Sequence, residues 1–111
     1  MARRSQLELL FEQHIFDAYL PKPETSYRFH PTRRWEADFA WPKLMLLCEL
    51  EGAEFVQGRH TRGRGFVNDC EKYAEAQILG WCVLRIPGSW VKNGTGIQYL
   101  SRLIRTLRKD Q

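Results

Sequence analysis

Residues 35–51, WEADFAWPKLMLLCELE, hold two apolar segments separated by a Pro–Lys pair, and they constrain the fold more than any other stretch. In the first segment large apolar side chains alternate with other residues, a pattern typical of a strand. The second segment, Leu44–Leu50, is almost continuously apolar, which is typical of a strand buried on both faces. Because only a short turn at Pro42–Lys43 separates the two, we expect an antiparallel hairpin.

The register of this hairpin decides which side chains share a face. A four-residue turn over Pro42–Met45 would set Asp38 opposite Glu49. Glu51 would then follow on the same face, about 6–7 Å further along the strand. A shift of one residue would separate Asp38 from the glutamates and would also split the apolar residues of the two strands between opposite faces. The core face is therefore expected to carry Trp35, Ala37, Phe39 and Trp41 beside Leu44, Leu46, Cys48 and Leu50.

Three carboxylates that converge at the end of a sheet repel one another and lose hydration. Asp38, Glu49 and Glu51 would meet in this way. A hard divalent cation such as Mg²⁺ offsets both effects, because it binds carboxylate oxygens and keeps positions for water and a phosphate oxygen. Spacing alone leaves a second interpretation open, in which these acids and Glu36 form the hydrated face of a half-exposed sheet.

The sequence before the hairpin predicts one helix and one strand. Ser5 and Glu8 form an S-x-x-E capping box, which marks a helix start, and Pro21 ends the helix. Apolar side chains recur on one stripe of this helix, as expected for a helix that packs on a core. A short strand is expected over residues 26–31, and the helix stripe consists of Leu7, Leu10, Phe11, His14, Ile15 and Ala18.

After the hairpin, a loop rich in glycine and arginine precedes a helix, a strand and a final helix. The first of these is expected over residues 66–79, with Gly80 at its C′ position. A buried strand follows over 81–86, and Asn93 or Thr95 caps the last helix. The resulting order, αβββαβα, predicts a single α/β domain with a mixed sheet. The side of helix 66–79 expected to face the core consists of Phe66, Cys70, Tyr73, Ala74 and Ile78.

The charge distribution favours a polyanionic partner such as DNA. The formal net charge is +4 at pH 7, and positive charge that gathers in patches is the electrostatic footprint of nucleic-acid binding. One patch lies in the turn after the first expected strand and the other in the glycine-rich loop. The candidate nucleic-acid contacts are Arg33 and Arg34 in the turn, and Arg59, His60, Arg62 and Arg64 in the loop.

Several classes of protein are disfavoured. No apolar stretch approaches the roughly 20 residues that span a bilayer, and acidic residues interrupt the segment that would form a signal peptide. We therefore expect a cytoplasmic protein without a membrane partner. The three cysteines, Cys48, Cys70 and Cys82, lie in apolar contexts without metal-ligand spacing, which predicts buried free thiols.

The order of these motifs resembles the PD-(D/E)XK nuclease superfamily, and most closely its small Vsr-like branch, which is related to very-short-patch repair endonucleases. The branch pattern runs DF, hydrophobic-E-x-D-G, H, D-x-x-(R/K) and G-W-x-V-x-R. The corresponding segments here read DFAWP, LLCELEG, GRH, DCEKY and LGWCVLRI, between about Tyr27 and Ile86. The resemblance implies one domain over residues 1–111 with a restriction-endonuclease-like core.

This resemblance also implies an activity. Such a protein would be a Mg²⁺-dependent DNA endonuclease that hydrolyses phosphodiester bonds, with Mn²⁺ as a substitute for Mg²⁺. A domain of this size offers little surface for reading sequence, so we expect it to recognise branched, nicked or mismatched DNA, with a homodimer left open. A different class of function remains as the alternative: a catalytically weak or inactive nucleic-acid-binding module on the same fold.

The resemblance assigns metal ligands residue by residue. Asp38 would be the metal-bridging aspartate, Glu49 the second ligand, and the carbonyl of Leu50 a third. Many members of the superfamily also place an acidic residue on the first helix. Either Glu8 or Glu12 could supply it here, because the two lie at i and i+4 on one edge of that helix.

One position departs from the family pattern. Glu51 stands where the superfamily usually has lysine and where the Vsr-like branch commonly has aspartate. A glutamate cannot supply positive charge, so Glu51 would bind the metal or orient a metal-bound water. The missing cation is then expected from Lys72 on the following helix, or from His60 or Arg62 in the loop.

Overall fold

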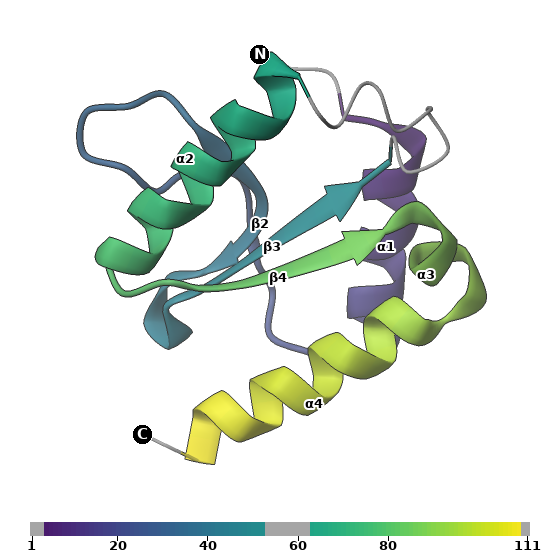
Figure 1. Cartoon of the computed structure of the whole chain (residues 1–111). Coiled ribbons are helices and arrows are strands. Elements are labelled where there is room, and N and C mark those ends of the chain that lie inside the picture. The colour runs from purple at the N-terminus through teal and green to yellow at the C-terminus, as the bar shows by residue number, and fades with distance from the viewer. Residues whose placement is uncertain (1–3, 53–62, 110–111) are drawn as a thin grey trace.

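A four-stranded mixed sheet forms the centre of the molecule in the computed structural model, which describes residues 4–52 and 63–109 (Figure 1). The strands lie side by side in chain order. The first three are antiparallel neighbours and the fourth runs parallel to the third. The strands are β1 (Glu24–Arg28), β2 (Glu36–Trp41), β3 (Leu46–Glu51) and β4 (Cys82–Pro87).

Helices cover both faces of the sheet, and the predicted αβββαβα order is confirmed, with one short helix added after β4. Helix α2 lies on one face as the crossover between the parallel strands β3 and β4, while the other helices cover the opposite face (Figure 1). The capping box at Ser5 and Glu8 is present. The helices are α1 (Gln6–Asp17), α2 (Arg64–Ile78), α3 (Gly88–Asn93) and α4 (Thr95–Lys109).

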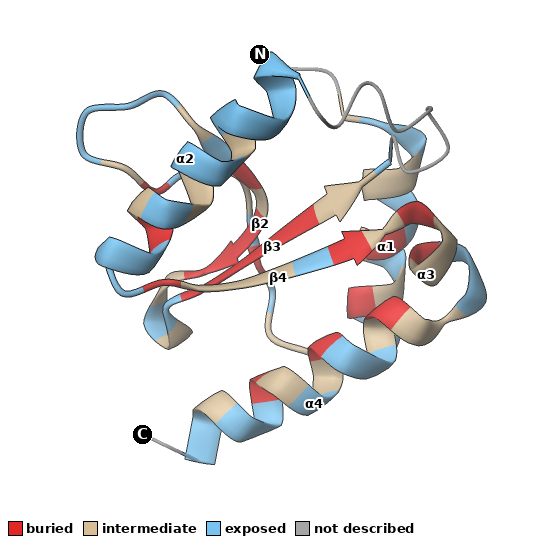
Figure 2. Cartoon of the chain, in the orientation of Figure 1, coloured by how far each residue is buried: buried red, intermediate tan, exposed pale blue. Residues whose placement is uncertain are grey.

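Two apolar clusters fill the space between the sheet and its helices. The larger lies under α1, α3 and α4, and the smaller lies under α2. Figure 2 shows the buried positions concentrated on the strands and on the inner sides of the helices. The buried residues of the larger cluster are Phe11, Ile15, Phe39, Trp41, Leu46, Cys48, Ile86, Val91, Leu100 and Ile104. Those of the smaller are Phe29, Ala37, Ala40, Leu47, Ala76 and Trp81.

The hairpin has the predicted register. Trp41 pairs with Leu46, and Phe39 pairs with Cys48. The turn comprises the 3₁₀ helix η1 (Pro42–Leu44) and Met45, which has a left-handed φ of 52°. This register brings Asp38 and Glu49 to the next opposed positions beyond the Phe39–Cys48 pair.

The predicted core face of β2 is partly wrong. Phe39 and Trp41 lie in the larger cluster, but Trp35 and Ala37 pack in the smaller one, on the α2 side. The alternation breaks at Asp38, where the backbone N–H donates to the side chain of Glu49 instead of to a β3 carbonyl. The regular pleat therefore does not continue through Asp38.

The first strand also ends earlier than expected, at Arg28. The chain turns directly after it, because His30 Nδ1 accepts the backbone N–H groups of Thr32 and Arg33 at 3.2 and 3.0 Å. These bonds stabilise a loop conformation in place of the predicted strand continuation to residue 31.

The predicted inner face of α2 is wrong for all but Tyr73. Four of the five residues expected to face the core are exposed, and the buried position is Ala76, with Lys72 and Tyr73 half-buried beside it. Lys72 and Tyr73 both bond to the buried Glu49 on β3. Leaving a buried carboxylate unpaired costs roughly 3–5 kcal/mol, so its partners determine which side of α2 faces the sheet. The exposed residues are Phe66, Cys70, Ala74 and Ile78.

Gly96 allows α4 to pack closely on the sheet. A methyl group there would lie 2.8 Å from Ile86 Cγ2 and 3.3 Å from the Trp90 carbonyl oxygen. We expect Gly96→Ala to lower the free energy of unfolding by about 1–3 kcal/mol, as measured by denaturant titration. Gly63→Ala is the control, because a methyl there meets no atom of residues 4–52 or 63–109 within 4 Å. Equal losses in both variants would contradict the packing argument.

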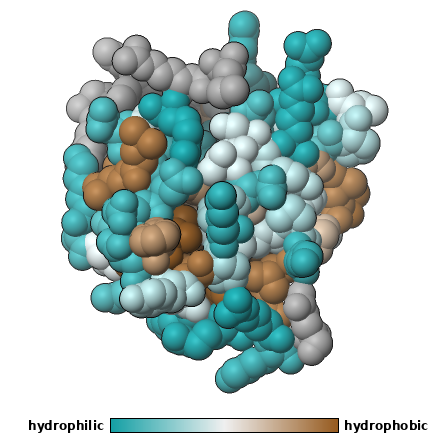
Figure 3. Space-filling view, turned by 180° about the vertical axis from the view of Figure 1, so that it is seen from behind, coloured by the Kyte–Doolittle hydropathy of each residue, from teal (hydrophilic) through white to brown (hydrophobic). Residues whose placement is uncertain are grey.

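The outer surface is mostly polar. On the face seen in Figure 3, hydrophobic areas of limited extent lie among hydrophilic side chains. Within residues 4–52 and 63–109, no helix is long and apolar enough to cross a lipid bilayer.

Candidate functional site

At Asp38 and Glu49, side-chain carboxylates accept hydrogen bonds from the backbone of the neighbouring strand. The Asp38 backbone N–H donates to Glu49 Oε2 at 2.9 Å, and the Leu50 backbone N–H donates to Asp38 Oδ2 at 2.8 Å. Each carboxylate thus accepts a backbone donor from the opposite strand. The two acids are therefore held in place by the strands of the sheet.

Glu49 is a buried carboxylate, 5% exposed, with partners for both oxygens. Its Oε1 is in contact with the ammonium of Lys72 and accepts the hydroxyl of Tyr73 at 3.3 Å. The same ammonium donates to the Glu36 carbonyl at 2.8 Å. A charged group is tolerated at this depth because it is both ion-paired and hydrogen-bonded.

Asp38 lies where its ionised form is disfavoured. Burial raises the pKa of its carboxyl from 3.8 to about 6, and the negative charges of Glu49 and Glu8 add to the increase. The Leu50 N–H and the Lys72 ammonium lower the pKa, but by less. A cation bound at Asp38 would reduce this repulsion.

Asp38 opens into a hollow of about 460 Å³ between the start of α1, the end of β3 and α3. Glu8 lines this hollow while it also closes the capping box, where its Oε1 accepts the Ser5 N–H at 3.1 Å. Glu12 does not line it and instead pairs with Arg4 at 2.7 Å. Of the two helix acids, Glu8 is therefore the one beside Asp38.

Glu51 points to a different partner. Its Oε1 accepts Arg85 Nη2 at 2.8 Å, and the Arg85 guanidinium lies over the ring of Tyr73, 4.6 Å from its centroid. Burial and the charges of Glu49 and Glu51 raise the pKa of Tyr73, so its hydroxyl stays protonated at neutral pH and can donate. The second acid of the E-x-E motif is thus ion-paired with an arginine of the neighbouring strand β4.

The predicted nucleic-acid contacts differ in their surroundings. Arg33 is already engaged, because its guanidinium lies 3.9 Å from the ring centroid of Trp35 and donates to Glu71 at 3.2 Å. Arg34 and Arg64 are exposed to solvent. The remaining predicted contacts lie outside the described residues; these are Arg59, His60 and Arg62.

The carboxylates fit a magnesium ion that has few protein ligands and keeps several water ligands. In the described parts of the chain, no group of three or more His, Cys, Asp or Glu side chains is arranged to hold a metal. Magnesium, however, is commonly bound through one or two carboxylates and keeps several waters. Asp38, with Glu8 across the hollow and the Leu50 main chain beside it, provides such a set.

Two residues near the site have neighbours that the sequence did not predict. Lys92 lines the hollow beside Asp38, although it is far away in the sequence. Its place depends on α3, and no local pattern connects it to β2. Tyr73 was expected in the core, whereas its hydroxyl bonds to Glu49. Glu49 follows directly on the apolar run of β3, so a buried carboxylate that needs hydrogen-bond donors could have been inferred there. A hydroxyl on the crossover helix is one such donor.

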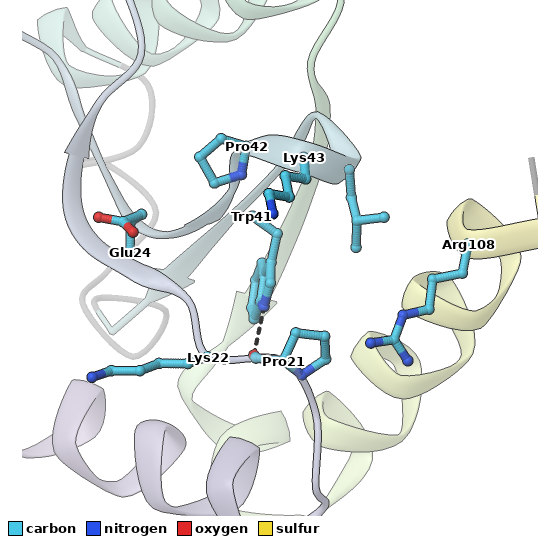
Figure 4. A pocket seen from close by; sticks show the side chains of 8 residues that line it. Pro21, Lys22, Glu24, Trp41, Pro42, Lys43 and Arg108 are labelled. Atoms are coloured by element: carbon cyan, nitrogen blue, oxygen red, sulfur yellow. Dashed lines mark hydrogen bonds between the residues drawn. The ribbon is translucent and has the colours of Figure 1, made fainter. Parts of the chain in front are cut away.

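A second pocket lies at the opposite end of the sheet, beside the hairpin turn (Figure 4). It has a volume of about 510 Å³, and the indole N–H of Trp41 donates to the Pro21 carbonyl at 2.8 Å within it. Neither Asp38 nor Glu49 lines it. The lining residues are Pro21, Lys22, Glu24, Trp41, Pro42, Lys43, Leu44 and Arg108.

The chain is similar to two proteins of Mycobacterium tuberculosis, "Uncharacterized protein MT2308" from strain CDC 1551 / Oshkosh and "Uncharacterized protein Rv2248" from strain ATCC 25618 / H37Rv. Each is 32% identical over 95 residues, which are 84% of this chain and 33% of the relative. The chain thus spans about a third of the length of these curated relatives. No protein-family model and no solved structure matches the chain.

Proposed function

We propose that this chain is a metal-dependent DNA endonuclease domain with a restriction-endonuclease-like core of the Vsr-like PD-(D/E)XK type. The observation that carries the proposal is the crossed pair of hydrogen bonds at Asp38 and Glu49, with Lys72 against Glu49. It holds two acids and a lysine at the point where β2 and β3 separate. These are the residue types that the resemblance assigns to catalysis.

In this proposal Asp38 binds the divalent cation, with Glu8 and the Leu50 carbonyl as further ligands or as acceptors for its waters. When bound, such an ion lowers the pKa of a water and neutralises charge on the phosphate. Asp38 contributes a carboxylate that is fixed by the Leu50 N–H and poorly hydrated. Its orientation is therefore set before the ion arrives, which lowers the cost of binding.

Lys72 supplies the positive charge that the motif lysine would otherwise provide. Its ammonium is held by Glu49 and by the Glu36 carbonyl, so it has a defined position beside the two acids. From there it can stabilise negative charge on a phosphate bound at Asp38. Glu51 and Arg85 form the outer part of the site, where a partly exposed guanidinium can hold a DNA phosphate.

The substrate we propose is branched, nicked or mismatched DNA. The exposed Arg34 and Arg64 offer phosphate contacts, which position a nucleic acid without reading its sequence. Magnesium is the proposed cofactor, with Mn²⁺ able to replace it.

One observation favours the alternative of a non-catalytic nucleic-acid-binding module. Glu49 is already neutralised by Lys72 and Glu51 by Arg85, so two of the three acids have protein partners. In a module without metal chemistry, these two ion pairs would serve only to stabilise the fold. The two functions differ in whether Asp38 and Glu8 bind a metal.

The matched variants Glu8→Gln and Glu12→Gln test the endonuclease proposal. We expect the purified protein to nick supercoiled plasmid with Mg²⁺ or Mn²⁺ and to stop when EDTA is added. Glu8→Gln should raise the Mg²⁺ concentration for half-maximal cleavage by about 10-fold or more, because it removes a charge beside Asp38. Glutamine can still accept the Ser5 N–H of the capping box.

Glu12→Gln is the control, since Glu12 lies on the same helix and contacts the same Arg4 as Glu8, at 2.7 and 3.9 Å, but does not line the hollow. It should leave the Mg²⁺ requirement unchanged. Tight binding without cleavage of duplex, single-stranded, nicked, mismatched or branched DNA would contradict the proposal and favour the binding module. Equal effects of the two variants would exclude Glu8 from the metal site.

A further inference from the structure

The outer side of α2 carries a row of apolar residues that the fold leaves uncovered. Phe66, Cys70, Ala74 and Ile78 recur at intervals of four, so they form one ridge along the helix. Phe66 is 52% and Ile78 76% exposed, and the neighbouring Val67 is 62% exposed. Figure 2 shows most of the α2 ribbon as exposed or intermediate. A surface helix normally turns its apolar stripe toward the core.

Two glutamates beside this ridge have side-chain partners in the loop between β1 and β2. Glu71 bonds to Arg33, and Glu75 bonds to His30. Both partners belong to the loop between β1 and β2, which draws the carboxylates to one edge of the helix. None of the four ridge side chains is charged, so covering the ridge itself desolvates no ionised group.

We propose that a second copy of this chain covers the ridge, with the two α2 helices antiparallel about a twofold axis. The spacing is self-complementary in this orientation. Cys70 would face Ala74 of the partner subunit, and Phe66 would face Ile78 of the partner subunit. The small residues lie at the centre, where the backbones approach most closely, and the large ones lie at the ends. A twofold pairing uses the same surface on both copies.

The size of the ridge predicts the strength of this pairing. We expect a pairing through one helix face to bury less than the roughly 1,200 Å² at the low end of stable interfaces. We therefore expect a weak dimer that forms in a concentration-dependent manner. The pairing would place one Glu49–Lys72 site on each side of the paired helices, since α2 carries Lys72 on its inner side.

The outer side of α1 is the competing surface. Leu9, Phe16 and Tyr19 are exposed there and line a groove of about 850 Å³. This groove also contains Glu12, Gln13 and Lys22, so it is a mixed surface. The α2 ridge is an unbroken row of four uncharged side chains, and it is the surface we assign to the second copy.

Cross-linking tests the orientation of the pair. In an antiparallel pair the two native Cys70 residues lie about 6 Å apart along the helix axis. The distance between the two helices adds to this separation. Their separation then exceeds the roughly 7 Å limit for a disulfide. Ala74→Cys creates a partner for Cys70 of the other copy, so mild oxidation should give a covalent dimer on a non-reducing gel.

Two results separate this orientation from other pairings. Ala74→Cys combined with Cys70→Ser should give no covalent dimer, because no opposed thiol pair remains. An oxidised wild-type protein that forms a Cys70–Cys70 disulfide as readily as Ala74→Cys cross-links would overturn the antiparallel orientation and indicate parallel helices.

Sedimentation equilibrium tests the surface itself and needs neither metal nor DNA. Ile78→Lys and Phe16→Lys are matched variants, because their side chains are 76% and 75% exposed in the monomer. Ile78→Lys should weaken self-association by about 10-fold or more, whereas Phe16→Lys should leave it unchanged. A wild-type protein that stays monomeric at millimolar concentration would overturn the proposal and indicate a different protein partner. Loss of association in Phe16→Lys alone would assign the interface to α1.

Discussion

Asp38→Asn is expected to abolish Mg²⁺-dependent DNA cleavage while it makes the metal-free protein more stable at neutral pH. The loss of cleavage follows from the role proposed for this carboxylate. A catalytic ion contributes several kcal/mol to the transition state, so losing its principal ligand should reduce the rate by about 100-fold or more. The gain in stability follows from the raised pKa of Asp38.

The sign of the stability effect can be worked out from that pKa. The Asp38 carboxyl titrates near 3.8 when unfolded and at about 6 in the folded protein. The folded state therefore binds this proton more tightly, and the contribution of Asp38 to the stability of the wild-type protein falls as the pH rises from about 4 to about 6. Above pH 6 the destabilisation is complete. After allowance for solvent screening it is on the order of 1–2 kcal/mol.

Denaturant unfolding in EDTA at pH 4.5 and pH 7.5 measures this effect. The difference in unfolding free energy between Asp38→Asn and the wild type should widen toward pH 7.5. Asparagine can keep the bond from the Leu50 N–H, so the variant tests charge more than hydrogen bonding. The exposed Asp17 is the control, and Asp17→Asn should leave the pH dependence unchanged. A pH-independent difference for Asp38→Asn would contradict the argument.

Glu49→Ala is expected to lower the free energy of unfolding by about 3–5 kcal/mol, the largest loss of stability among the site variants. The substitution leaves the Lys72 ammonium without its carboxylate in a place where the lysine side chain is 14% exposed. It also removes the acceptor for the Tyr73 hydroxyl and for the Asp38 backbone N–H. Each buried donor without a partner costs about 1–3 kcal/mol.

The matched control for this variant is Glu51→Ala, on the same strand two residues later. The Glu51–Arg85 pair is partly exposed, with side chains 30% and 48% accessible, so its loss should cost less than about 1 kcal/mol. The double variant Glu49→Leu with Lys72→Leu should recover much of the stability that Glu49→Ala loses, because no buried charge remains unpaired. Equal losses for Glu49→Ala and Glu51→Ala would contradict the assignment.

The parts of the fold that local patterns control could be predicted from the sequence. The capping box at Ser5 and Glu8, the turn at Pro42–Met45 and the register that opposes Asp38 to Glu49 all depend on neighbouring residues or on strand alternation. The order of helices and strands was predicted for the same reason. The left-handed Gly80 that follows α2, with φ of 93°, was expected from its type and position.

What could not be predicted depends on interactions between distant elements. The rotation of α2 is the clearest example, since the helix turns Lys72 and Tyr73 to the sheet in place of its apolar ridge. An apolar period shows which residues share a side of a helix, but not whether that side meets its own domain. The choice between Glu8 and Glu12 and the presence of Lys92 in the hollow depended likewise on how α1 and α3 pack against the sheet.

The parallel pairing of β3 with β4 also implies an order of events during folding. Strands β1, β2 and β3 are joined by short connections and can associate early, whereas β4 must wait for the crossover through α2. We therefore expect Glu49 to reach its place between the strands before Lys72 docks against it. Until then its carboxylate must remain hydrated, which keeps that edge of the nascent hairpin open to water. Closure of the sheet and docking of α2 are thereby coupled into one late cooperative step.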